Sequence, residues 1–582
     1  MTATDTSIAA GAFVPGKTQA RFRQEPTPDR APGTIRGWSE PSWNSLALLV
    51  FLAATFLALA TFTDYGITWD EDVHNFYGKL VLNYYLSGFT DLRATHWMDL
   101  FNYGGAFDMS AAALNYFSPF DTYETRHLLN ALVGVVGLIG AARLGRQLAG
   151  PRAGFLAALF LVLIPNYYGQ MFNNPKDIPF AAGLVWSFYY LVRLAPDLPR
   201  PPWPTVLKLG LAAGLTLGIR VGGFMIFGYL GIVLSLAGIW RALAAYRRGL
   251  RAQIAILAGD GFASLWRVLL PSLAVAYSVM LVFWPYAQQA PFQNPLNALA
   301  TFSHEVFPFR TLFDGQYIPA TDLPWDYLPV HVALALPELV LVLLIAAAPA
   351  AVFIARAYRW RIARAAALGY FIVTFGIVFP IAYAIAIKAV LFDGMRHFIF
   401  VLPLIAALTA AVMDRALTRL ASWTYRRWAY SALALYAFVH IGIMAALHPD
   451  EYVYYNAFIG GVEGANGLFK LDYWANSYAE AVTALEDQLQ AEYGADYMDR
   501  DFTVAVCGPP ISAGFYFPPN FIFENDRERA EFFIAFTKDN CNKQLPGREI
   551  YRVQRMGVTL SVVLDRRGIL AAKEAPHPAA RR

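Results

Sequence analysis

Four ionisable side chains lie within one short stretch of the chain, TWDEDVH: Asp70, Glu71, Asp72 and His74. Thr68 and Glu71 fit a capping box, which would make the acids the start of a helix. Asp70 has no role in such a box, and neighbouring helical residues face different partners. We therefore predict Asp70 as a catalytic carboxylate, Glu71 as either a cap or a second site residue, and Asp72 and His74 as candidates for binding substrate.

A single lysine interrupts the stretch NYYGQMFNNPKDIPFAAG, residues 166–183. A turn at Asn174 and a helix cap at Asp177 explain most of its polar residues. Neither needs Lys176, and a lysine beside the exposed amides of a helix N-terminus suits a phosphate group. We predict Lys176 as a phosphate ligand and keep Asn174 as a candidate for binding substrate.

Other cations stand at the ends of apolar runs: Arg220 in GLTLGIRVGGF, and Lys388, Arg396 and His397 in KAVLFDGMRHFIFVLP. Snorkelling of basic side chains to a membrane interface is the plain alternative. Ionisable residues at membrane segments nevertheless point to function by default. If they share one membrane face with Asp70, they converge on a carboxylate and suit the phosphate of a donor.

Two further features remain open at this level. Tyr473 and Trp474 follow the last apolar run and suit either a sugar-binding surface or an interfacial aromatic belt. His304 and Glu305 could begin a metal site, but no third ligand accompanies them. We expect no required cofactor, and a divalent metal lacks support.

Composition places these residues in a membrane protein. The 582-residue chain is 57% hydrophobic and 15% charged. Apolar runs long enough to span a bilayer predict about eleven transmembrane helices. They lie near residues 44–63, 127–142, 153–166, 178–194, 205–219, 221–240, 266–284, 329–354, 366–388, 397–413 and 428–446.

The distribution of lysine and arginine predicts the orientation. Basic residues concentrate in the N-terminal tail and in every second loop, which places the N-terminus inside. Residues 64–126, 167–177, 285–328, 388–396 and everything after about 447 then lie outside. The formal net charge of +4 reflects this asymmetry and gives no reason to expect nucleic acid as a partner.

The chain divides into three parts on this reading. Residues 1–42 are rich in Pro and Arg and predict a disordered cytoplasmic tail. Residues 43–447 form the membrane domain, with long outer loops at 64–126 and 285–328. Residues 448–582 predict a small exported α/β domain with one helix in YAEAVTALEDQLQAEY and strands in DFTVAVCG, EFFIAFT and YRVQRMGVTLSVVLD. Its two cysteines, Cys507 and Cys541, are free to form a disulfide or to stay apart.

The acidic pair in a long first outer loop, together with "FNNPKDIPFA" and "DGMRHFIFVLP", resembles the GT-C superfamily of polyprenyl-phosphate-sugar-dependent glycosyltransferases. The likeness covers roughly residues 44–447 and is closest to the protein O-mannosyltransferases and the lipid A aminoarabinose transferase. It implies that Asp70 is the catalytic carboxylate, that Glu71 shapes the site and that outer cations hold the donor phosphate.

The chemistry of the residues agrees with this resemblance. A lipid-phosphate sugar carries its own leaving group, so the protein must supply a base, cations for the phosphate and an apolar groove. We expect transfer, with inversion, from a polyprenyl-phosphate sugar to a hydroxyl of a glycan, lipid or protein. The setting would be a bacterial inner membrane with the C-terminal domain in the periplasm. A secondary transporter or lipid flippase is the alternative, although the sequence shows no repeated halves.

Overall fold

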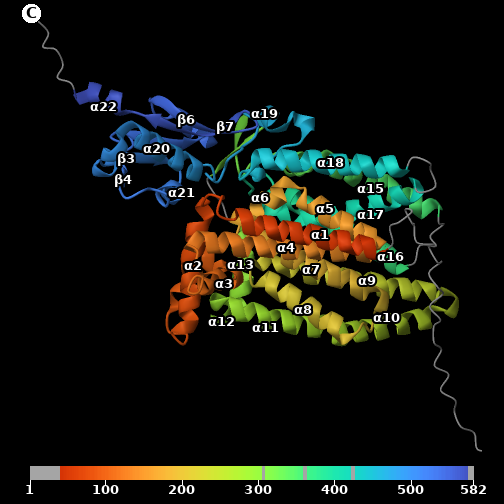
Figure 1. Cartoon of the computed structure of the whole chain (residues 1–582). Helices are drawn as coiled ribbons and strands as arrows, with labels where there is room; N and C mark the ends of the chain where they lie inside the picture. Colours follow the sequence, from red (N-terminus) through yellow and green to blue (C-terminus); the bar gives the residue numbers. More distant parts are fainter. Residues whose placement is uncertain (1–39, 305–308, 358–363, 421–425, 575–582) are drawn as a thin grey trace, which may run out of the picture.

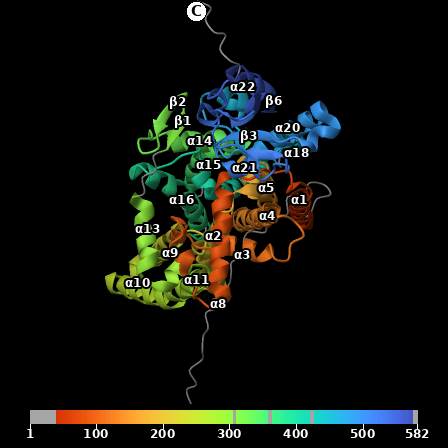
Figure 2. The ribbon, with the colours of Figure 1, turned by 90° about the vertical axis from the view of Figure 1, so that its left-hand side faces the viewer.

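The computed structural model describes residues 40–304, 309–357, 364–420 and 426–574. Long helices run side by side and form a bundle, and the C-terminal domain (Tyr478–Glu574) sits against one end of it (Figure 1). Helix α2 (Trp69–Leu86) crosses that same end, beneath the C-terminal domain (Figure 2). We call this the outer end of the bundle. The predicted tail, residues 1–42, lies almost entirely outside the described residues.

The bundle contains a helix for each of the eleven predicted segments. Eight helices in the described ranges are long and apolar enough to cross a membrane, and α5 and α6 form a further pair bent by 67°. Two more, α8 and the first part of α15, are apolar but shorter. The helices are α1 (Glu40–Thr61), α4 (Thr122–Ala149), α5 (Pro151–Val162), α6 (Pro165–Asn173), α7 (Asp177–Leu194), α8 (Trp203–Leu217), α9 (Met225–Ala244), α10 (Leu250–Ser264) continuing into α11 (Leu270–Phe283), α15 (Glu338–Ala357), α16 (Arg364–Ala386), α17 (Leu402–Leu420) and α18 (Arg426–Leu447).

Proline explains the bend between α5 and α6. Pro165 occupies the first turn of α6, where its missing N–H leaves no helical hydrogen bond unmade, and it separates the two helices. The bend carries the chain back across the outer end and brings Lys176 to the start of α7. A single straight helix would place these residues elsewhere.

Short elements cover the outer end of the bundle. They come from the two long loops and from the segment before α17. They are α3 (Ala106–Leu114), α12 (Pro285–Gln289), α13 (Gln293–His304), the antiparallel hairpin β1 (Arg310–Phe313) and β2 (Gln316–Pro319), α14 (Tyr327–Ala335) and the 3₁₀ helix η7 (Arg396–Val401).

The C-terminal domain is a five-stranded mixed sheet with helices, as the sequence predicts. It begins later than the predicted residue 448, because the apolar side chains of residues 452–474 pack in the core of the bundle. The strand order is β4-β3-β5-β7-β6, in which β3 pairs in parallel with β4 and β5, and β7 runs antiparallel to β5 and β6. The elements are α20 (Tyr478–Tyr493), β3 (Phe502–Cys507), α21 (Pro510–Gly514), β4 (Phe521–Phe523), β5 (Phe532–Phe536), β6 (Arg548–Arg555), β7 (Val558–Asp565) and α22 (Arg567–Glu574). Cys507 and Cys541 form a disulfide, which the sequence left open.

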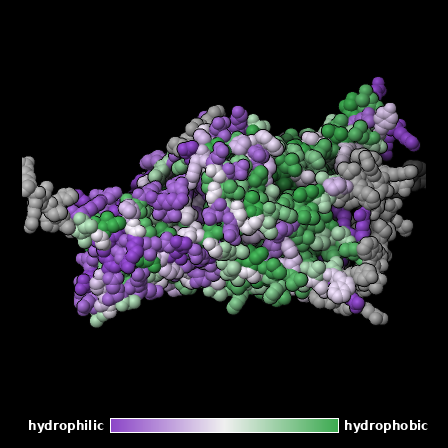
Figure 3. Space-filling view, turned by 90° about the horizontal axis from the view of Figure 1, so that it is seen from above, coloured by the Kyte–Doolittle hydropathy of each residue, from purple (hydrophilic) through white to green (hydrophobic). Residues whose placement is uncertain are grey.

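The surface separates these two parts by polarity. Hydrophobic residues spread over the helix bundle, whereas hydrophilic residues gather over the C-terminal domain (Figure 3). Exposed leucines and phenylalanines occupy α1 and α18, where Phe56 and Phe438 are 69% and 74% exposed. Such a belt is expected of helices whose solvent is lipid. The protein is therefore a multi-pass helical membrane protein with a mixed α/β C-terminal domain.

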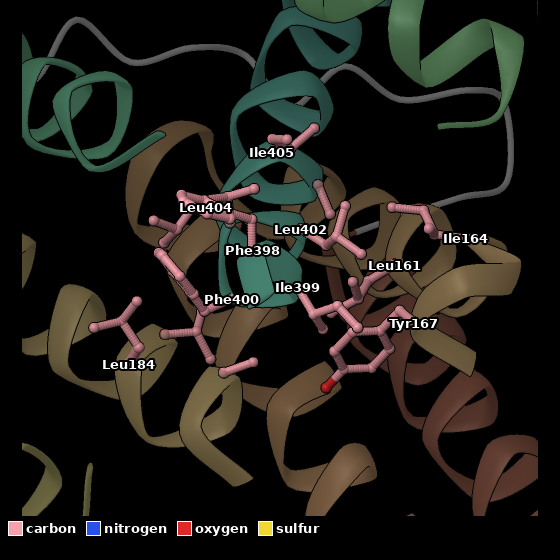
Figure 4. Close-up of a cluster of buried hydrophobic side chains, with 14 of the residues drawn as sticks. Leu161, Ile164, Tyr167, Leu184, Phe398, Ile399, Phe400, Leu402, Leu404 and Ile405 are labelled. Atoms are coloured by element: carbon pink, nitrogen blue, oxygen red, sulfur yellow. The ribbon is translucent and has the colours of Figure 1, made fainter. Parts of the chain in front are cut away.

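A buried apolar cluster fixes η7 in the bundle. Side chains of η7 and α17 point toward residues of α5, α6 and α7, among them Leu161, Tyr167 and Leu184 (Figure 4). Ile399 and Leu402 are completely buried there. Packing of this kind leaves η7 little freedom to move, so the core sets the position of its first residue, Arg396, at the outer end.

Candidate active site

At the outer end, Asp70 contacts Arg396, although the two residues are 326 positions apart in the sequence. Asp70 lies in the first turn of α2, and its Oδ2 accepts a hydrogen bond of 2.9 Å from Nη2 of Arg396, the first residue of η7. The Asp70 side chain is 23% exposed and that of Arg396 only 3%. Burial raises the pKa of Asp70, but the positive charges of Arg396 and Lys176 outweigh burial and hold the pKa well below its usual range. Asp70 is thus a reachable carboxylate.

Arg396 has hydrogen-bonding capacity to spare. Its guanidinium lies 5.1 Å from the ring centre of Phe392 and 5.3 Å from that of Trp474. Among the described residues, its Nε and Nη1 and the indole Nε1 of Trp474 are buried without a hydrogen-bond acceptor, and Nδ1 of His397 is buried without a hydrogen-bond partner. A buried donor without an acceptor is costly. An incoming anion with several oxygens would satisfy such donors.

Two further cations meet at one aromatic ring. Lys176 Nζ lies 5.0 Å and the Arg220 guanidinium 5.8 Å from the ring centre of Tyr103, which comes from the first outer loop. Arg220 also donates a hydrogen bond to Asp177 at the start of α7. Lys176 acts electrostatically on Asp70. The structure therefore gathers Lys176, Arg220 and Arg396 around the start of α2, and His397 follows Arg396 in η7.

The acidic residues at the start of α2 have different partners. The backbone N–H of Thr68 donates to Glu71 Oε2 at 2.8 Å, which completes the capping box, and Glu71 Oε1 lies 3.0 Å from Nε2 of His127. Asp72 accepts a hydrogen bond from Tyr123 at 2.9 Å. His127 and Tyr123 both lie near the start of α4. The geometry therefore gives Glu71 and Asp72 local structural contacts and leaves Asp70 alone facing Arg396.

His74 belongs to a second buried cluster. Its Nδ1 lies 2.8 Å from Asp108 Oδ2, and Arg126 Nη2 donates to Asp108 Oδ1 at 2.6 Å. Burial raises the pKa of Asp108, and the charges of His74 and Arg126 bring it below its usual value. This cluster ties α2, α3 and α4 to one another.

The remaining predicted residues are Asn174, Tyr473 and Lys388, and each has different neighbours. Asn174 hydrogen-bonds with Gln170 and Asp177 and so shapes the turn before α7. Tyr473 is buried, accepts a hydrogen bond from Gln170 and packs on Trp474 with ring centres 4.9 Å apart. Lys388 is exposed and lines a separate small cavity with Trp325 and Leu391, so the structure does not bring it to the cluster.

A cavity of about 660 Å³ opens beside the cluster. It lies between the membrane domain and the C-terminal domain: Trp69 and Asp393 line one side, and the disulfide between Cys507 and Cys541 lines the other. Sequence reasoning missed three of its charged residues, Asp393, Lys470 and Lys538. Asp393 has the signal of an Asp-Gly turn, and its φ is 56°. Lys470 and Lys538 look like ordinary surface lysines in the sequence, although their side chains are only 6% and 7% exposed.

The described residues contain no group of three or more His, Cys, Asp or Glu side chains that could hold a metal ion. Glu305, one half of the weak pair noted above, lies outside the described residues. The arrangement at Asp70 is suited to a phosphorylated ligand: one reachable carboxylate stands against several cations and unsatisfied donors.

A protein-family model matches part of the bundle. Residues 122–263 match the family of dolichyl-phosphate-mannose-protein mannosyltransferases. This is a GT-C family. The segment holds Lys176 and Arg220 but neither Asp70 nor Arg396. The match confirms the predicted resemblance to the GT-C superfamily and supports a membrane glycosyltransferase.

Solved structures with a similar course of the chain are distant. The crystal structure of ArnT from Cupriavidus metallidurans bound to undecaprenyl phosphate is 14% identical, with a TM-score of 0.47, over 90% of this chain and 98% of that one. The oligosaccharyltransferase of Archaeoglobus fulgidus in its apo form is 13% identical, with a TM-score of 0.43, over 85% of this chain and 65% of that one. No curated protein matches the sequence.

Proposed function

We propose that the protein transfers a sugar from a polyprenyl-phosphate donor to an acceptor hydroxyl at the outer end of the bundle, with inversion at the anomeric carbon. The observation that carries this proposal is the pair of Asp70 and Arg396. It sets a reachable carboxylate against a buried guanidinium whose Nε and Nη1 have no hydrogen-bond acceptor among the described residues.

The phosphate of the donor is the ligand that these cations suit. Arg396 offers two nitrogens, Nε and Nη1, that find no acceptor among the described residues, and the unpaired ring nitrogens of His397 (Nδ1) and Trp474 (Nε1) add to them. Lys176 and Arg220 add positive charge at Tyr103. Charge-assisted hydrogen bonds of this kind strengthen as negative charge grows on the leaving phosphate, so they stabilise the transition state more than the ground state.

Asp70 is the base in this scheme. The acceptor oxygen forms a bond to the anomeric carbon while the bond from that carbon to the phosphate oxygen breaks. The electron pair of the broken bond leaves with the phosphate, and the acceptor proton passes to Asp70. In the free protein Arg396 lowers the pKa of Asp70. A bound donor phosphate also draws on that guanidinium, so the pKa of Asp70 rises once the donor is bound. Asp70 can then accept the proton of the acceptor hydroxyl.

The acceptor would approach from the cavity of about 660 Å³ next to Trp69. A hydroxyl of a glycan, lipid or protein is the acceptor class, and a hexose or pentose is the sugar. We place the reaction on the periplasmic face of a bacterial inner membrane. The scheme requires no metal ion.

The test is donor consumption by the purified protein in nanodiscs, over a panel of polyprenyl-phosphate sugars with extracted envelope acceptors. We expect one donor to be consumed by the wild type and Asp70→Asn to lower its turnover about 10²- to 10⁴-fold, the usual contribution of a general base. Asp72→Asn is the matched control, because Asp72 lies in the same turn but contacts Tyr123.

Two outcomes contradict the proposal. Equal turnover by wild type and Asp70→Asn would reduce Asp70 to part of a helix start. No turnover of any donor, together with a substrate-coupled proton leak, would favour a transporter instead.

A further inference from the structure

One lysine of the C-terminal domain contacts both sides of the Asp70 and Arg396 pair. Lys538 Nζ lies 4.1 Å from the ring centre of Trp69, the residue before Asp70. It also lies 3.7 Å from Oδ1 of Asp393. Asp393 is itself 3.7 Å from Arg396 through Oδ2 and Nη1. The Lys538 side chain therefore contacts both Trp69, the residue before Asp70, and Asp393, which pairs with Arg396.

The loop that carries Lys538 is fastened to its own sheet. The 3₁₀ segment η11 (Lys538–Lys543) follows β5, and Asp539 and Asn540 adopt positive φ angles of 53° and 57°. Asp and Asn tolerate this conformation better than most residues. The next residue, Cys541, is bonded to Cys507 at the end of β3. The disulfide thus fixes the loop relative to the parallel strands.

The charges around Asp393 make Lys538 more than a packing contact. Asp393 is buried and shared by Arg396, Lys538 and Lys470, whose Nζ lies 3.5 Å from its Oδ1. Burial raises the pKa of Asp393, and Lys538 and Lys470 hold it below its usual value. Without the Lys538 charge, Asp393 would draw more strongly on Arg396 and compete with Asp70 for it.

We propose that the C-terminal domain is part of the active site and that Lys538 is a positioning residue, which sets Asp70 through Trp69 and Arg396 through Asp393. This inference rests on the proposed function, because the geometry it controls is that of the catalytic pair. It gives the C-terminal domain a role in catalysis besides covering the outer end.

The first test compares Lys538→Gln, Lys538→Arg and Lys543→Gln in nanodiscs. Lys543 is an exposed lysine of the same loop and serves as the control. We expect Lys538→Gln to lower kcat roughly 10- to 100-fold, because a misplacement of about 1 Å at reacting groups costs that much. Lys538→Arg should recover most of the loss, and Lys543→Gln should match the wild type. Equal kcat for Lys538→Gln and Lys543→Gln, or a folded Lys538→Arg as poor as Lys538→Gln, would overturn the inference.

Hydrogen–deuterium exchange reads the same positioning without turnover. Lys538→Gln should raise exchange in peptides covering Trp69 and Asp393, whereas Lys543→Gln should not. Unchanged exchange at both would contradict the inference even if no donor were found. A wild type that consumes no donor but shows the expected exchange would refute the proposed function alone.

The pH profile separates charge from packing. Burial lowers the pKa of Lys538 below that of an ordinary lysine, and Lys470 and Arg396 act in the same direction against Asp393 and Asp539. Activity that needs the charged form is lost as pH rises through this pKa. Lys538→Arg stays charged to higher pH, so its alkaline loss should move upward. An unchanged alkaline limb would count against the charge of Lys538.

The disulfide provides a further check. Replacing both Cys507 and Cys541 with serine frees the loop, so we expect kcat to fall in the same direction as in Lys538→Gln and exchange of residues 538–543 to rise. Wild-type kcat and exchange in this variant would exclude the disulfide from the positioning.

Discussion

Helix α2 starts with two kinds of charged contact, and they differ in how far along the chain the partner lies. Glu71, Asp72 and His74 contact His127, Tyr123 and Asp108, all within or next to the first outer loop. Asp70 instead contacts Arg396, 326 residues away. The local contacts can form as soon as α2, α3 and α4 meet, whereas the distant one requires the assembled bundle.

Access separates the two kinds of contact as well. Arg126 also keeps two guanidinium nitrogens without an acceptor among the described residues, yet its side chain is 1% exposed and that of Asp108 is 6% exposed. The Asp70 side chain is 23% exposed, and the preceding residue, Trp69, lines the cavity of about 660 Å³. A sealed cluster suits stability, and an open one suits chemistry.

The largest effect on stability should come from a substitution in the sealed cluster of His74, Asp108 and Arg126. Asp108→Asn leaves the buried Arg126 without its carboxylate, and breaking a buried pair in this way costs about 3–5 kcal/mol. We expect a clear fall in the free energy of unfolding, measured by denaturant titration in detergent. Asp70→Asn should change it far less. If both variants unfold alike, the distinction between sealed and open clusters is wrong.

How much of this the sequence could predict follows from the range of each contact. Hydropathy predicted the segments of the bundle, and the capping box at Thr68 was legible because its members are three residues apart. The pairing of Asp70 with Arg396 depends on the bend at Pro165 and on the packing of η7, which no local pattern contains. Lys538 shows the same limit, since its burial arises only where the C-terminal domain meets α2.

The next effect concerns Arg396 itself. Arg396→Gln removes the guanidinium that faces Asp70, and we expect kcat/KM for the donor to fall about 10²- to 10³-fold, as for the loss of one transition-state donor. Arg396→Lys keeps a charge but not the planar set of N–H groups, so it should recover only part. Lys388→Gln is the matched control, because Lys388 is exposed and lines another cavity.

Acid titration sharpens this prediction. Arg396 contributes to holding the pKa of Asp70 below its usual range, so the wild type should keep an ionised base through mildly acidic pH. In Arg396→Gln the pKa of Asp70 rises, and the residual activity should fail at a higher pH than in the wild type. Coincident acid limbs for the two proteins would show that Asp70 is not the group that titrates.

The smallest effect tests a distant contact with a structural role. His448 joins Asp64 Oδ2 at 3.0 Å to Glu451 Oε1 at 2.9 Å and so ties the start of the first outer loop to the end of α18. Burial lowers the pKa of His448, but the hydrogen bond and charge of Glu451 outweigh it and raise the pKa to about 9. Because folding raises the pKa of His448, protonation of its ring stabilises the fold. This stabilisation is complete at pH values below the unfolded pKa, near 6.5, and it is lost as pH rises through about 9.

We therefore expect His448→Gln to lower the free energy of unfolding by roughly 1–2 kcal/mol at pH 6, less than a fully buried charged contact because His448 is 28% exposed. The difference from the wild type should shrink above pH 9, whereas donor turnover per folded molecule should not change. A pH-independent difference would mean that the ring acts by packing, and lost turnover would mean that distance along the chain, rather than access to the cavity, marks the functional contacts of this outer end.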